Sequence, residues 1–132
     1  MAAPTPVTYT RQVGHGGVSL WQATWTDSTN ITDSVIVDLS ALASGYVNSL
    51  KICKITCVNT ANIDLLLEFD ATADQLVAFK PGGTNAMTYD FTQTPDGGLV
   101  KTASGATGDL VLTTTNAANG EEVFLVIEWW AD

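Results

Sequence analysis

Basic residues and histidine are scarce in this sequence, and their scarcity excludes several classes of function. The chain has 132 residues, with five Lys or Arg against 14 Asp or Glu and a formal net charge of −9. Nucleic acids and anionic membranes are bound by clustered basic side chains. The basic residues are instead scattered, at Arg11, Lys51, Lys54, Lys80 and Lys101. We therefore expect neither nucleic acid nor a membrane among the partners.

Cysteines and long apolar runs are also few. Cys53 and Cys57 would share one face of a strand about 13 Å apart, whereas a disulfide needs Cα atoms within about 7 Å. We therefore expect two small buried thiols. The first residues lack the apolar segment of a secretory signal, and no run reaches the roughly 18 apolar residues of a membrane span. These absences predict a protein made and kept in a reducing cytoplasm.

Groups suited to catalysis are sparse as well. His15 is the single histidine and lies between glycines, where we expect its ring to be poorly held. Glu68, Asp70 and Asp74 have the spacing of glycosidase acids or calcium ligands, but a solvated acidic face explains them more simply. The sequence therefore predicts a protein that is not an enzyme and that holds no metal and no cofactor.

The clearest positive signal is the segment Ile63–Asp70, IDLLLEFD. Its apolar residues alternate with a mostly acidic set, and they are Ile63, Leu65, Leu67 and Phe69. Successive side chains of a strand point to opposite faces. The alternation therefore predicts a β-strand with one buried face and one solvated face.

Similar segments recur along the whole chain. About eight or nine short strands are separated by turn sequences at intervals of about 8–12 residues. Segments 49–58 and 63–69 predict a hairpin. The pattern is typical of an all-β fold, an antiparallel β-sandwich, and this number of strands favours a jelly roll.

The chain length fits one domain. Residues 1–12, which include Pro4 and Pro6, are expected to form an extended N-terminal arm. Within that arm Val7–Val13 has the composition of an edge strand. Residues 13–132 are expected to form the single β-sandwich domain.

Tryptophans offer the best candidates for a contact surface. Trp129 and Trp130 are adjacent in the last predicted strand, so they point to opposite faces, and one must leave the core unless both faces are covered. An exposed tryptophan serves as a sugar platform or as an anchor for a protein partner. Phe124 and Val126 extend the apolar stripe beside Trp130, which favours a protein contact.

Five motifs follow one another in a characteristic order. They are VIVDLSALASG (35–45), LLLEFDATAD (65–74), FTQTPDGGLV (91–100), GATGDLVLTT (105–114) and EEVFLVIEWW (121–130). In this order the chain resembles small all-β virion proteins of tailed bacteriophages, especially marine and cyanobacterial ones. The resemblance covers most of residues 18–130.

The resemblance implies a structural component of the virion, and in particular a capsid decoration or cement protein on the capsid surface. Its partners would be the major capsid protein and further copies of itself, as a dimer or trimer. A tail, neck or fibre component and a carbohydrate-binding module using Trp21, Trp25 or Trp130 remain as alternatives. The candidate contact residues are Pro4, Pro6, Tyr9, Arg11, Trp129 and Trp130.

Overall fold

The protein is all-β. The structure, a computed structural model, describes residues 4–42, 50–59, 62–83, 85–100 and 109–131. Its strands are β1 (Val7–Val13), β2 (Gly16–Thr24), β3 (Ser34–Val37), β4 (Leu50–Asn59), β5 (Asp64–Phe69), β6 (Gln75–Lys80), β7 (Asn85–Asp90), β8 (Leu99–Val100), β9 (Leu110–Thr115) and β10 (Glu122–Ala131), with a 3-10 turn η1 at Leu39–Ala41. Within these residues there is no helix of the length and hydropathy needed to cross a bilayer.

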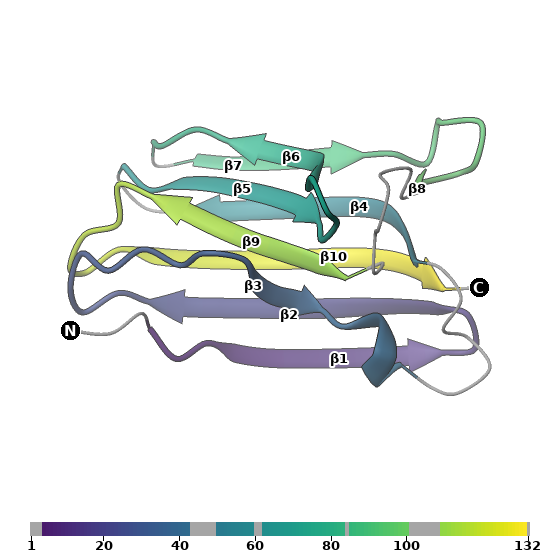
Figure 1. Cartoon of the computed structure of the whole chain (residues 1–132), viewed down its shortest axis with the longest axis horizontal. Helices are drawn as coiled ribbons and strands as arrows, with labels where there is room; N and C mark the ends of the chain where they lie inside the picture. The colour runs from purple at the N-terminus through teal and green to yellow at the C-terminus, as the bar shows by residue number, and fades with distance from the viewer. Residues whose placement is uncertain (1–3, 43–49, 60–61, 84, 101–108, 132) are drawn as a thin grey trace.

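The strands form two antiparallel sheets that lie one in front of the other (Figure 1). Sheet A has the order β1-β2-β10-β4-β7, and β8 pairs with the beginning of β4, at Lys51 and Ile52. Sheet B has the order β3-β9-β5-β6. The predicted all-β, two-sheet antiparallel architecture is therefore confirmed, and the arrangement is sandwich-like.

The core lies between the inner faces of the two sheets. Leu125 and Ile127 of β10 are fully buried and belong to the same cluster as Leu65 and Leu67 of β5. The alternation predicted for β5 is confirmed, because its apolar set is buried and its acidic set is only half-buried. Each large side chain moved out of water contributes about 1.5–3 kcal/mol, so this shared cluster holds the two sheets together.

The predicted hairpin between segments 49–58 and 63–69 is wrong. β4 lies in sheet A, between β10 and β7, whereas β5 lies in sheet B, between β9 and β6. The short connection therefore crosses from one sheet to the other. β4 pairs with β10 and β7, and β5 pairs with β9 and with the next strand along the chain, β6.

The two cysteines do not share a face as predicted, because β4 contains a β-bulge. Lys54 pairs with Glu128 of β10, but the next residue of β10, Trp129, pairs with Ile52, so Cys53 is the extra residue. A bulge shifts the alternation of the strand by one residue. Cys57 consequently lies in the core, whereas Cys53 is half-buried.

The N-terminal segment joins sheet A from Val7 onward. β1 pairs with β2 along its whole length and forms one border of sheet A (Figure 1). The edge strand predicted for Val7–Val13 is therefore present, and the boundary expected after residue 12 falls inside it. A two-residue turn, Gly14-His15, joins β1 to β2, and Gly14 has the positive φ of 61° that such tight turns require.

Candidate functional site

The outer face of sheet A carries many apolar side chains on neighbouring strands, and we call it the apolar face. Its most exposed members are on β1, where Val7, Tyr9 and Val13 are 66%, 63% and 71% exposed. The register places further members beside them on the neighbouring strands. These are Val18, Leu20, Phe124, Val126, Trp130 and Val58. Exposed apolar patches of this kind are typical of protein contacts.

Trp130 is the exposed member of the tryptophan pair, at 42%. Its ring stacks on His15, with ring centroids 5.4 Å apart and an interplanar angle of 21°. The His15 Nδ1 donates to the carbonyl oxygen of Ala131 at 2.6 Å, and the His15 carbonyl accepts from the Ala131 amide. The expectation of a poorly held histidine is therefore wrong: His15 is fixed, and it supports Trp130.

Trp129 lies in the core, at 2% exposure, and not on a surface where a partner would reach it. Its indole Nε1 donates to Ser19 Oγ at 2.9 Å, which satisfies the buried N–H. Its ring lies over Gly17, where a Cβ would be 2.2 Å from Trp129 Cζ2. This candidate contact residue is consequently corrected to a core residue.

The other candidate contact residues lie at or near β1. Tyr9 and Arg11 are both exposed on it, and their register partners on β2 are Leu20 and Val18. Both therefore lie on the apolar face. Pro4 and Pro6 precede the strand and are half-buried.

Trp21 and Trp25 are core residues, each 1% exposed. Their rings are tilted against each other with centroids 6.3 Å apart. The Trp25 Nε1 donates to the Thr29 carbonyl at 2.9 Å. Two of the three rings on which a sugar platform depended are thus inside the protein.

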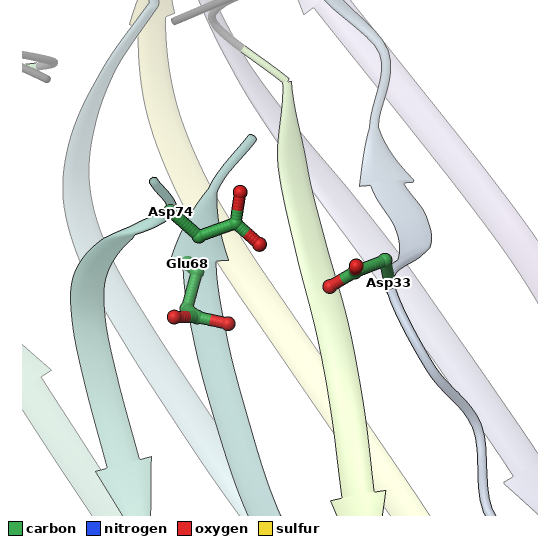
Figure 2. Close-up of side chains that lie close together, drawn as sticks. All are labelled: Asp33, Glu68 and Asp74. Carbon is green, nitrogen blue, oxygen red and sulfur yellow. The ribbon is translucent and has the colours of Figure 1, made fainter. Parts of the chain in front are cut away.

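An acidic cluster lies on the outer face of sheet B. It consists of Asp33, Glu68 and Asp74, and one carboxylate oxygen of each lies within 4.8 Å of the other two. Figure 2 shows Asp33 reaching across β9 from one side, while Glu68 and Asp74 lie on the other. The sequence singled out Glu68, Asp70 and Asp74. In the structure Glu68 and Asp74 lie together, and the third member of the cluster is Asp33, not Asp70.

The members of the acidic cluster are held in place from several segments. Asp74 Oδ1 accepts a hydrogen bond from the Ala71 amide at 3.0 Å, and Asp33 Oδ1 accepts one from Thr113 Oγ1 at 3.3 Å. Burial, and then repulsion by Asp74 and Asp33, raise the pKa of Glu68 above its usual value. Three converging carboxylates offer the oxygen ligands that Ca²⁺ and Mg²⁺ prefer, and exposed acidic groups also occur without any ion.

The carboxylate of Asp64, the first acidic residue of β5, accepts hydrogen bonds from neighbouring segments of the fold. Its Oδ1 accepts from the Gly82 amide, and its Oδ2 accepts from Thr115 Oγ1 at 3.1 Å and Asn116 Nδ2 at 2.9 Å. The carboxylate thereby connects β5 to the turn after β6 and to the end of β9. These bonds occupy both oxygens, so Asp64 contributes to the fold.

Comparison with known proteins adds no family to this description. Neither a model of a protein family nor a curated protein sequence matches the chain.

Proposed function

We propose that this protein is a non-enzymatic virion structural protein, most specifically a capsid decoration or cement protein that binds the shell of the major capsid protein. The single observation that carries the proposal is the apolar face. Large apolar side chains that are exposed or half-exposed on one sheet are costly to leave in water, and a protein neighbour that covers them removes this cost. The net charge of −9 keeps the free chain soluble until it meets that neighbour.

The order of the strands supports the proposal. We propose that the fold is a jelly roll, formed by β2-β10-β4-β7 in one sheet and β3-β9-β5-β6 in the other, with β1 added at the edge. Successive strands β2, β3, β4 and β5 alternate between the two sheets, as expected for interlocked Greek keys. Jelly rolls are frequent among viral capsid and lectin domains. A jelly roll is therefore compatible with a virion protein, but the fold by itself assigns no binding site.

A tail, neck or fibre component is the second candidate, because the same apolar face would serve it equally well. The two candidates differ in copy number. A decoration protein is present in numbers comparable to the major capsid protein, whereas a tail or neck component is present in far fewer copies.

Quantitative mass spectrometry of gradient-purified particles tests the proposal. We expect the chain in the particles at a ratio to the major capsid protein near that of a shell component, and cryo-electron microscopy should place its density on the head. A ratio far below this assigns the chain to the tail or neck. Absence from purified particles refutes a virion role altogether.

A further inference from the structure

We propose that the apolar face binds a second copy of this chain, through a two-fold axis that runs along β2 and lies in the plane between the two facing sheets. The inference rests on the proposed function only in treating this face as a protein contact. A contact of this type is isologous, so the surface must be complementary to itself. The register of sheet A allows that condition to be examined row by row.

β2 is flanked by β1 on one side and by β10 on the other, and the three strands are in register. A two-fold rotation about an axis along β2 preserves the position along the strand and exchanges the two sides. It therefore places β1 of one copy opposite β10 of the other, at the same row. The four rows of outward side chains are Val7–Gln22–Phe124, Tyr9–Leu20–Val126, Arg11–Val18–Glu128 and Val13–Gly16–Trp130.

The apolar rows are complementary under this rotation. Tyr9 comes to lie opposite Val126 of the second copy, and Val7 opposite Phe124 of the second copy. Leu20 lies on the axis and faces its own counterpart. Val13 comes to lie opposite Trp130 of the second copy, so all three of the most exposed apolar side chains of β1 are covered by apolar side chains of β10.

The charged row is complementary as well. Arg11 on β1 is the only cation in the four rows, and Glu128 on β10 is the only anion. The rotation places Arg11 of each copy opposite Glu128 of the other, so each dimer gains two opposite-charge contacts. A two-fold axis along β10 would instead place Glu128 against Glu128. The charges therefore select β2 as the strand that carries the axis.

The shape of the face agrees with this pairing. A hollow of about 370 Å³ lies at the end of the β1–β2 hairpin, lined by Arg11, Val13, Gly16, Gly17 and Val18. Gly16 contributes no side chain to this row, and the Trp130 ring of the same chain lies beside it, 3.4 Å from the position that a Cβ would take. The rotation brings Trp130 of the second copy opposite Val13, at the border of this hollow. Large aromatic side chains that meet a depression in the partner's surface are frequent anchors of protein interfaces.

The expected contact is small. At the usual strand spacing and residue repeat, three strands of four facing positions cover about 400 Å² on each copy. That area is below the range of stable interfaces, so we expect a weak, reversible dimer in solution that is favoured by the high local concentration within an assembly.

Charge reversal tests the geometry, with association measured by sedimentation equilibrium of the purified chain. Arg11→Glu and Glu128→Arg should each weaken self-association by about tenfold or more, because two attractive contacts per dimer become repulsive. An equimolar mixture of the two variants should associate at least as well as the wild type, since both contacts are then attractive again. Recovery in the mixture also shows that each variant is folded.

Thr88→Glu is the matched control, because Thr88 is exposed on the same face of sheet A but lies on β7, outside the three overlapping strands. It should leave association unchanged. A wild type that stays monomeric at the highest soluble concentration refutes the inference, as does a dimer indifferent to both charge reversals, such as one paired edge to edge through β1. A monomer found in virions would refute only this inference, and a dimer absent from virions would refute only the proposed function.

Discussion

At the scale of single residues, Gly17 decides whether Trp129 fits into the core. The indole covers the position that a Cβ of Gly17 would occupy, with Trp129 Cζ2 at 2.2 Å. Gly16, the preceding residue, is the natural comparison, since its own Cβ would be 3.4 Å from the nearest atom, in Trp130. Neither glycine has a positive φ, so the difference between them is one of space and not of backbone strain.

We therefore predict that Gly17→Ala lowers the free energy of unfolding by about 1–3 kcal/mol, the usual cost of an overpacked core. Gly16→Ala should change it by less than about 0.5 kcal/mol. Urea denaturation followed by tryptophan fluorescence measures both. Equal effects of the two substitutions would show that Trp129 moves aside easily, and that its bond to Ser19 does not fix its position.

Glu68 gives a residue-scale prediction for pH. Burial and the neighbouring Asp74 and Asp33 raise its pKa above the usual 4.5, so the folded state retains the proton to higher pH than the unfolded state. Stability attributable to this group is therefore present at low pH and is lost as pH rises from about 4.5 through the raised pKa. Glu68→Gln should consequently be more stable than the wild type near neutral pH, and the difference should disappear below pH 4.5.

Carbon-detected NMR titration of the Glu68 carboxyl separates the two causes of the shift. Asp74→Asn and Asp33→Asn should each lower the pKa of Glu68 part of the way, because each removes one repulsive charge while burial remains. Titration curves that coincide with that of the wild type would mean that the three carboxylates are farther apart in solution.

At the scale of elements, β4 shows what alternation in a sequence does and does not determine. Both faces of this strand are apolar in the sequence, a pattern that favours a strand in the centre of a sheet, and β4 does lie between β10 and β7. The bulge brings apolar residues of both faces inward, because Leu50 and Ile52 lie on the inner face before it and Ile55 and Cys57 lie there after it. A bulge depends on the pairing with β10 and leaves no local signal. The pairing of β5 with β9 contains no bulge, and the alternation in its sequence predicted correctly which face is buried.

The candidate sites divide in the same way. Tyr9, Arg11 and Trp130 are exposed, as expected for contact residues, and their role in a contact stays a prediction. Asp33 was missed because it precedes β3 and reaches Glu68 only through the strand order β3-β9-β5, which pairs segments far apart in the chain. Trp129 was assigned to a contact because adjacent residues of a strand always diverge, and the sequence does not say which one points inward.

The bulge predicts different reactivities for the two cysteines. Burial raises the pKa of Cys57 to about 11, with Lys80 opposing the shift, and burial also raises the pKa of the half-buried Cys53. Because the thiolate is the reactive form, both should react with a disulfide reagent more slowly than a free thiol at mildly alkaline pH. Cys53 should react first, and Cys57 only when the protein unfolds.

The single-cysteine variants Cys57→Ala and Cys53→Ala assign the two rates, and the same reactions in concentrated urea give the rates of the unfolded chain. If Cys57 reacts in the native protein as fast as Cys53, the two thiols share an environment and the bulge at Cys53 is absent in solution.

At the scale of the whole molecule, one cluster of side chains forms the inner face of both sheets. Sheet B alone would expose Leu67 and Phe69, and sheet A alone would expose Leu125, so separating the sheets costs nearly the whole hydrophobic contribution to folding. We therefore expect the two sheets to unfold together, in a single transition. Hydrogen exchange of individual amides resolves this, since it reports the free energy of opening at each strand.

Leu67→Ala in β5 is the decisive substitution. Leu67 belongs to sheet B, but its side chain is part of the core cluster that both sheets share. It should lower the free energy of exchange by about 2–5 kcal/mol. The decrease should be the same for the amide of Leu112 in sheet B and for the amide of Leu125 in sheet A. Leu76→Ala, on the exposed face of β6, should change neither. A decrease confined to sheet B would show that each sheet is stable by itself. Sheet A could then keep the apolar face ordered without sheet B.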